Sequence, residues 1–375
     1  MPKKDKNKKK KERSAFEQKF DYWAGKLFRV KSTDKIFFVD HLRIMVKAGL
    51  SLVDALNILA KEVANKKFKK IISQIRDEVE KGRQLSEVLG EHPKVFPIIY
   101  VKMIASGEVA GKLEESLEQI VNQMKKSHEL VSSIRGAMIY PAVILTAMSG
   151  IGIMMTTFVL PKILELFKDF DAELPLATRT LIAIVDFLSN PVYLVLIIAV
   201  AAGSIALFAA MMKRSPKFKK TIHTINLYLP IFGRVVKQIN LAKFSLTLSS
   251  LLKSTIPIID AMDITADTCA NVNYQESLHS AAVKMKSGEP LSEILREYDK
   301  FFPPMVTEMI MVGERSGEVD QMLIELSEFY GREVDKTMKN FSTIIEPVII
   351  ILLGIAVAGI AVAVIMPMFS LAQSF

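Results

Sequence analysis

The sequence SGEVAG at residues 106–111 returns as VGERSG at residues 312–317. Both stretches contain the pattern Gly-Glu-x-x-Gly, and they lie 206 residues apart. A pattern this short can recur by chance, so its meaning depends on whether the surrounding sequence repeats at the same offset. The motif residues are Gly107, Glu108 and Gly111 in the first copy and Gly313, Glu314 and Gly317 in the second.

The flanking sequence does repeat at this offset, without a gap. LSE at 85–87 matches LSE at 291–293, FP at 96–97 matches FP at 302–303, and Pro141 matches Pro347. The matches indicate an internal duplication of residues 35–165 and 241–371.

Each copy is predicted to be helical. Between residues 112 and 135 the apolar residues recur mostly every three or four positions, which is typical of the buried stripe of a helix. Sustained alternation with a period of two does not occur. Each repeat is therefore predicted to be a bundle of helices without a sheet.

Long uncharged stretches indicate a membrane protein. Half of the 375 residues are hydrophobic, and residues 136–160, 187–212 and 347–375 contain no charged side chain. About 20 helical residues cross a bilayer, so each stretch is long enough. The predicted fold class is an all-α membrane protein with two duplicated cytoplasmic helical bundles and three transmembrane helices.

The distribution of charge predicts the topology. The net charge is +9, and residues 1–35 alone hold 13 Lys/Arg against 5 Asp/Glu. Residues 213–220 contain five basic and no acidic residues, whereas acids outnumber bases in 161–190. By the positive-inside rule the N-terminus and both bundles face the cytoplasm, and the C-terminus faces outward.

These observations divide the chain into eight segments. They are a basic arm that we expect to be disordered (1–34), a cytoplasmic bundle (35–135), a transmembrane helix (136–160), an outward-facing loop (161–190), a second transmembrane helix (191–212), a second cytoplasmic bundle (213–343), a third transmembrane helix (344–367) and an outward-facing tail (368–375).

Signals for catalysis or cofactor binding are absent from the sequence. The five histidines lack metal-ligand spacing, and Cys269 stands alone. The acids at 169–173 could bind a cation or simply be solvated, and we favour the second interpretation. The basic arm could meet nucleic acid, anionic lipid or an acidic partner, but no nucleic-acid fold signature accompanies it. We therefore expect no enzyme, no cofactor and no nucleic-acid partner.

Two equivalent dipeptides mark the predicted membrane entrances. Tyr140-Pro141 and Glu346-Pro347 occupy corresponding positions in the two copies. Each proline removes one backbone hydrogen bond, which can kink a helix. Glu346 is either a functional intramembrane acid or an interfacial side chain that reaches headgroups or Lys339. We favour the interfacial interpretation.

The motifs, taken in order, resemble those of a known family. With the motifs above, LPLAT at 174–178, LPIFG at 229–233 and PMF at 367–369 resemble the type II secretion protein F family, the inner-membrane platform proteins of type IV pilus assembly and type II secretion. The resemblance covers residues 35–372. One departure is Thr255, which replaces the glycine present at Gly49 in the first copy.

The resemblance implies a function. Such platforms are not enzymes and lie in the cytoplasmic membrane, where they couple a cytoplasmic assembly ATPase to the assembly of pilin or pseudopilin subunits. The implied partners are that ATPase, those subunits, other inner-membrane assembly proteins, the lipid bilayer and further copies of the chain in a homo-oligomer. The alternatives are a multi-pass transporter or channel, which needs polar residues deep in its spans, and a membrane scaffold with another partner.

The repeated motif has a predicted role. We expect it to lie between two helices, where its glycines permit a tight turn and Glu108 and Glu314 accept hydrogen bonds at the start of the following helix. The alternative is that the two glutamates dock the motor.

Overall fold

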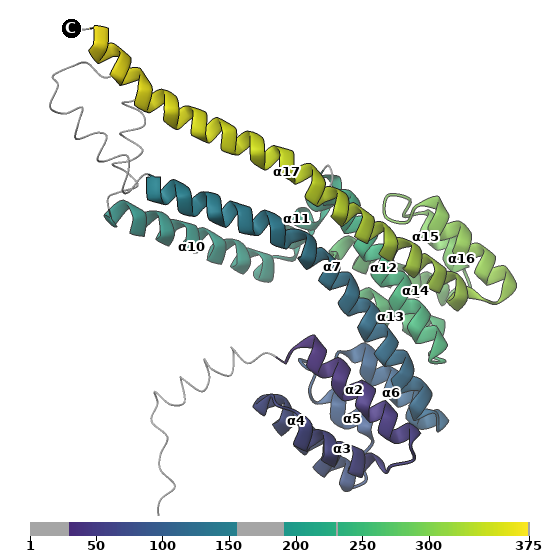
Figure 1. Cartoon of the computed structure of the whole chain (residues 1–375). Coiled ribbons are helices and arrows are strands. Elements are labelled where there is room, and N and C mark those ends of the chain that lie inside the picture. The colour runs from purple at the N-terminus through teal and green to yellow at the C-terminus, as the bar shows by residue number, and fades with distance from the viewer. Residues whose placement is uncertain (1–29, 156–190, 230–231, 374–375) are drawn as a thin grey trace, which may run out of the picture.

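A computed structural model describes residues 30–155, 191–229 and 232–373. Helices joined by short turns make up this part of the chain, which contains no strand (Figure 1). The expectation of an all-α protein is confirmed for the described residues.

The two copies contain the same helices in the same order. A shift of 206 residues carries the first residues of α3, α4, α5, α6 and α7 onto those of α13, α14, α15, α16 and α17. The first copy comprises α2 (Ser32–Lys47), α3 (Leu52–Glu62), α4 (Lys66–Glu80), α5 (Leu85–Gly90), α6 (Ile98–Ala110) and α7 (Leu113–Met154), and the second comprises α12 (Phe232–Lys253), α13 (Ile258–Thr268), α14 (Val272–Met285), α15 (Leu291–Arg296), α16 (Pro304–Ser316) and α17 (Val319–Gln373).

Each bundle closes around a buried aromatic cluster. The rings of Phe38 and Phe68 lie 5.5 Å apart and pack edge to face, and Phe96 completes the group. Phe244, Tyr274 and Phe302 occupy the corresponding positions in the second copy. All six side chains are buried, so they bring the helices together around one apolar centre in each repeat.

Local sequence explains where several helices begin. The Ser51 hydroxyl accepts the backbone N–H of Asp54 at the start of α3. The Asn65 side chain accepts two N–H groups at the start of α4, and the Asn271 side chain accepts one at the start of α14. These side chains satisfy donors that have no partner within their own helices.

Two long helices leave the bundles. Figure 1 shows α7 and α17 running toward the same end of the molecule, with α10 (Pro191–Arg214) on that side as well. Within the described residues, α7 and α17 are long and apolar enough to cross a membrane. Pro141 lies inside α7 without ending it.

The described residues cover the predicted spans unevenly. The span 136–160 is described to residue 155, and α17 includes the predicted span 344–367 and part of the predicted tail 368–375. α10 is described from residue 191, ends at Arg214, two residues beyond the predicted span, and leads into α11 (Pro216–Tyr228). The predicted loop 161–190, with its acids at 169–173, and residues 1–29 of the basic arm lie outside the described residues. Residues 32–34, which we expected to belong to the disordered arm, form the start of α2 instead.

Thr255 adopts a conformation that disfavours its side chain. Its φ is +57°, the one positive value among the described non-glycine residues, whereas Gly49 reaches +82° at the same place in the first copy. A left-handed backbone costs an L-residue about 1–2 kcal/mol, and a β-branched residue is among the least suited to it. The departure from glycine noticed in the sequence therefore leaves a strained turn before α13.

We expect Thr255→Gly to raise the free energy of unfolding by about 0.5–1 kcal/mol. Relief of the strained φ outweighs the extra backbone entropy of glycine, which is about 0.5–1 kcal/mol. Thermal unfolding of the full chain measures the change. Gly49→Thr is the reverse control and should destabilise, so a loss of stability in Thr255→Gly would contradict the strain explanation.

Candidate functional site

The Gly-Glu-x-x-Gly motif forms the end of a helix, which corrects the prediction that it lies between two helices. Four of its five residues belong to the last turn of α6 or α16, and the final glycine follows that turn. Gly111 and Gly317 adopt φ values of +68° and +78°. The backbone N–H of Lys112 donates to the Gly107 carbonyl at 2.8 Å, which closes the helix end in the usual way for a glycine cap.

The first glycine of the motif allows two helices to approach closely. A Cβ atom at Gly107 would lie 2.6 Å from the Cβ of Ser116, on α7. A Cβ atom at Gly313 would lie 2.8 Å from the Cα of Val319, the first residue of α17. The motif therefore seats the start of each long helix against the bundle.

The motif glutamate reaches back to an earlier helix. Oε1 of Glu108 accepts the backbone N–H of Leu85 at 2.7 Å, and Oε2 accepts that of Ser86 at 3.1 Å. Glu314 accepts the N–H groups of Leu291 at 2.6 Å and Ser292 at 3.3 Å. Each carboxylate thus satisfies two N–H groups at the start of α5 or α15.

The predicted partner of the two glutamates, the start of the following helix, was therefore wrong. Side chains on a helix lean toward its N-terminus, so a glutamate in the last turn of α6 points away from the start of α7. Glu108 and Glu314 instead tie α5 to α6 and α15 to α16, a structural role that engages both carboxylate oxygens.

The two predicted membrane-entrance positions lie next to each other. The Tyr140 side chain lies beside the Glu346 carboxylate. Tyr140 and Glu346 are both exposed in the chain, Pro141 is buried and Pro347 is exposed. Glu346 thus has a partner that the sequence interpretation did not consider, at the equivalent position of the other repeat.

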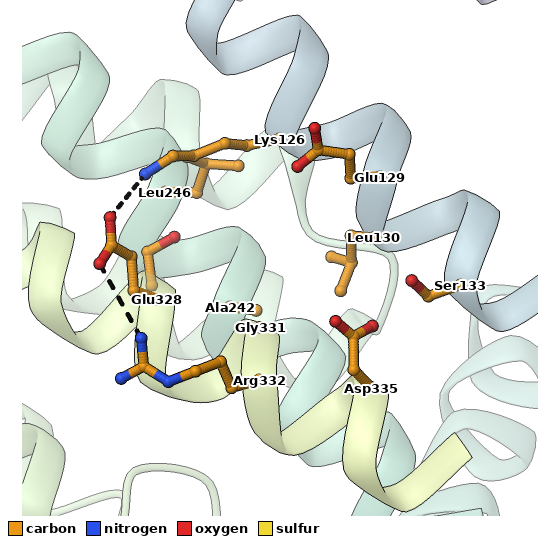
Figure 2. Close-up of a pocket in the computed structure, with 11 residues that line it drawn as sticks. Lys126, Glu129, Leu130, Ser133, Ala242, Leu246, Glu328, Gly331, Arg332 and Asp335 are labelled. Atoms are coloured by element: carbon orange, nitrogen blue, oxygen red, sulfur yellow. Dashed lines mark hydrogen bonds and ion pairs between the residues drawn. The ribbon is translucent and has the colours of Figure 1, made fainter. Parts of the chain in front are cut away.

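A cleft separates the long helices where the bundles meet. It has a volume of about 220 Å³ and lies between α7 and α17, above α12. Figure 2 shows Glu328 of α17 between Lys126 of α7 and Arg332 of α17. The Lys126 Nζ–Glu328 Oε1 distance is 3.0 Å, and Arg332 Nη1 lies 4.0 Å from Glu328 Oε2.

The charges of the cleft are mixed and largely exposed. An exposed ion pair contributes only about 0–1 kcal/mol to the free energy of unfolding. Lys126 and Glu328 therefore mark where the two repeats touch but add little stability there. No motif in the sequence marks these residues. The one available signal is that Lys126 and Arg332 lie 206 residues apart and are both basic.

Polar side chains join the two bundles beneath this cleft. The Ser250 hydroxyl donates to Gln123 Oε1 at 2.8 Å, and Gln123 Nε2 donates to the Thr247 hydroxyl at 3.4 Å. The Ser106 hydroxyl donates to the Ser254 carbonyl at 2.7 Å. We call this contact between α6–α7 and α12 the joint.

A histidine attaches α11 to the second bundle. The backbone N–H of Val272, the first residue of α14, donates to His223 Nδ1 at 3.0 Å, and the Asn271 side chain donates to the His223 carbonyl. An accepting Nδ1 requires the neutral ring. Burial, followed by the nearby positive charge of Lys219, lowers the pKa of His223 below its ordinary value.

We expect the protein to lose stability as the pH falls below about 6.5, the ordinary histidine pKa. The unfolded chain then binds a proton at His223 more readily than the folded chain, and the loss continues until the pH passes the lowered folded pKa. Thermal unfolding at pH 7.5 and 5.5 measures it. In His223→Gln, which keeps an acceptor but does not titrate, the pH dependence should be smaller, and an unchanged dependence would contradict this role.

Comparison with known proteins gives a consistent result. The family model for type II secretion system (T2SS), protein F matches residues 38–161 and 244–367, which again differ by 206. The type IV pilus assembly protein PilC of Thermus thermophilus is 36% identical over 340 residues, covering 90% of this chain and 82% of the relative.

Two further relatives come from different machines. The type IV pilus assembly protein PilC of Myxococcus xanthus is 34% identical, covering 92% of this chain and 81% of its own length. The type II secretion system protein F of Pseudomonas aeruginosa is 30% identical, covering 92% and 84%. Similarity therefore extends through both bundles and all three apolar segments.

Proposed function

Because the chain belongs to the type II secretion system protein F family, whose members are components of pilus and secretion machines, we propose that it is an inner-membrane platform that couples a cytoplasmic assembly ATPase to the assembly of pilin or pseudopilin subunits. The platform carries out no chemistry of its own. Its work is to transmit a displacement from the cytoplasm to the membrane.

The continuity of α7 and α17 carries this proposal. Each helix begins against a bundle at the glycine motif and continues into an apolar segment without interruption. A stiff helix transmits a rotation or tilt of its base along its length. The two helices also contact each other through Lys126–Glu328 and Tyr140–Glu346. A movement of one bundle would therefore displace both α7 and α17.

We further propose three membrane crossings, with the N-terminus and both bundles in the cytoplasm and the C-terminus outside. The large apolar side chains of α10 support the third crossing, since Val195, Ile205 and Leu207 are all more than 60% exposed in the chain. Lys213 and Arg214 end that helix, as the positive-inside rule requires of a cytoplasmic boundary.

Thiol labelling in intact cells should reveal this topology. With Cys269 replaced by serine, Asp171→Cys is expected to react with a membrane-impermeant reagent, whereas Lys219→Cys is expected to react only after the cells are opened. The direction follows from the charge on either side of the second apolar segment. Labelling of Lys219→Cys but not Asp171→Cys in intact cells would reverse the topology.

The coupling role is tested by purification and by output. We expect the solubilised chain to retain a hexameric assembly ATPase, and we expect deletion of the chain to abolish pilus or pseudopilus assembly while the ATPase and subunits are still made. Retention of no ATPase under mild detergent, together with normal assembly in the deletion strain, would refute the proposal.

The transporter alternative has little support in the described helices. The hydroxyls of Thr146, Ser149 and Ser204 all donate to carbonyls of their own helices. Such groups are already satisfied and do not need to bind a substrate. A scaffold for another partner would be distinguished by its failure to retain the ATPase.

A further inference from the structure

The joint between the repeats is built from two different surfaces. One is formed by Thr247 and Ser250 of α12 together with Ser254 in the turn after it, and the other is the face of α6–α7 that carries Ser106 and Gln123. A contact between unlike surfaces is heterologous, so each participating unit is left with one unused surface. Two repeats in one chain therefore leave two such surfaces uncovered.

The first uncovered surface lies on α2. The residues 206 positions before Thr247, Ser250 and Ser254 are His41, Ile44 and Ala48. Ile44 is 50% exposed, and the neighbouring Phe37, which stacks on His41, is 41% exposed. We call this stripe, which runs along α2 and ends at Ala48 just after it, the α2 face.

The second uncovered surface lies on α16 and α17. The residues 206 positions after Ser106 and Gln123 are Val312 and Phe329. Val312 is 52% exposed, and Phe329 is partly exposed beside Tyr330. We call this surface the α16–α17 face.

Both uncovered faces are less polar than the joint. Where Gln123 meets Thr247 and Ser250 in the joint, the corresponding residues are Phe329 on one face and His41 and Ile44 on the other. Where Ser106 meets Ser254, they are Val312 and Ala48. Apart from His41, which replaces Thr247, the polar side chains of the joint are replaced by apolar ones on both faces, as complementary surfaces require.

Among the described residues, the two faces lie on helices that pack against different neighbours. α2 packs mainly against α7 and α3, whereas α17 packs mainly against α12, α7 and α16. In this part of the chain Ile44 and Val312 stay about half exposed, and Phe329 is only partly covered by the core of its own bundle.

We propose that the α2 face of one copy docks onto the α16–α17 face of a second copy, in the arrangement that the joint already shows. The direction of the helices permits this in one membrane. Because α7 and α17 run toward the same end of the molecule (Figure 1), the movement that carries the first repeat onto the second keeps the membrane helices on one side. Repetition of a heterologous contact closes into a ring or extends as a chain of copies.

Cross-linking between two co-expressed, differently tagged full-length chains tests the contact. One chain carries Ile44→Cys and the other Phe329→Cys, and both keep Cys269, which is buried with a thiol pKa raised by burial to about 12. We expect a short bifunctional thiol reagent to join the two tags in membranes and to join neither chain to itself. Self-linkage of Ile44→Cys at equal yield, or no linkage between the tags, would overturn the proposal.

Two matched controls define the background. Gln123→Cys with Ser250→Cys in one chain samples the joint itself and should give a cross-link within the chain. Ile44→Cys with Val283→Cys combines one proposed contact residue with a residue of α14 that is 64% exposed and outside both faces. If this second pair were linked as efficiently as Ile44→Cys with Phe329→Cys, the cross-link would be explained by random collision and not by a specific contact.

Charges introduced into the two faces test the contact independently of cross-linking. Ala48→Lys and Val312→Glu place charges at exposed positions of the two faces, so each alone should weaken self-association at least about tenfold without lowering the melting temperature. Together they oppose a lysine to a glutamate and should restore the assembly. We would measure the mass of the solubilised protein by light scattering, and an unchanged mass in both single variants would overturn the proposal.

Discussion

Gly313→Ala is expected to lower the free energy of unfolding of the protein by about 1–3 kcal/mol, the range found when an extra carbon is forced into a packed site. The added Cβ would lie 2.8 Å from the Cα of Val319 and 3.2 Å from the Glu318 carbonyl oxygen. Both are backbone atoms that no change of rotamer can move. The start of α17 would have to shift away from α16.

Gly331→Ala is the matched control for this substitution. Gly331 also lies in a helix, but a Cβ there meets nothing within 4 Å. Alanine at that position should be neutral or stabilising by up to about 1 kcal/mol because of its higher helix propensity. Thermal unfolding of the full chain in detergent compares the two, and equal melting temperatures for Gly313→Ala and the parent would contradict the close-packing role.

A shift at Gly313 should also have a functional consequence. If the base of α17 transmits displacement, loosening it should reduce pilus or secretion output more than the loss of folded protein explains. Output per folded molecule is therefore the informative quantity. We expect Gly331→Ala to leave it unchanged.

The duplication and the helix order could be predicted from sequence because both depend on local patterns. Apolar spacing, the cap at Ser51 and the glycine at Gly111 act within a few residues of their own positions. Because the copies are related by a constant offset of 206 residues, a helix boundary predicted in one copy also predicts the equivalent boundary in the other. Thr255 shows the limit, since the sequence showed a departure from glycine but not the positive φ that persists despite it.

The contacts of the motif could not be predicted in the same way. Glu108 lies 23 residues from Leu85, and a carboxylate near a helix end suggests a cap for the next helix before it suggests one for an earlier helix. Tyr140 and Glu346 lie side by side although they are 206 residues apart, and the joint uses side chains on the outer surfaces of two bundles. Each depends on how helices are placed in space, which periodicity does not specify.

Glu314→Ala is expected to cost at least about 2 kcal/mol, because a buried donor left without an acceptor costs about 1–3 kcal/mol and this substitution removes the acceptor of three donors. The donors are the backbone N–H groups of Leu291 and Ser292 and the Ser292 hydroxyl, and both residues are almost fully buried. Their burial makes the expected cost larger than that of an exposed helix cap, which is about 0.5–2 kcal/mol.

Glutamine distinguishes the loss of the hydrogen bonds from the loss of the charge. Glu314→Gln keeps one acceptor oxygen and should cost about half as much as alanine, since one of the two N–H groups remains paired. If Glu314 instead docked the motor through its charge, stability would hold, assembly would fail, and glutamine would be as harmful as alanine.

Glu293→Ala provides the control for charge near the same helix. Glu293 is an exposed residue in the first turn of α15, so its loss removes a favourable charge–dipole interaction of about 0.3–1 kcal/mol but no hydrogen bond to a buried N–H group. Thermal unfolding of the three variants, with hydrogen exchange over α15, separates these contributions. Because the Leu291 and Ser292 amides both lose their acceptor only in Glu314→Ala, exchange there should accelerate most in that variant. Unchanged exchange and melting would refute the structural role of the motif glutamate and favour motor docking.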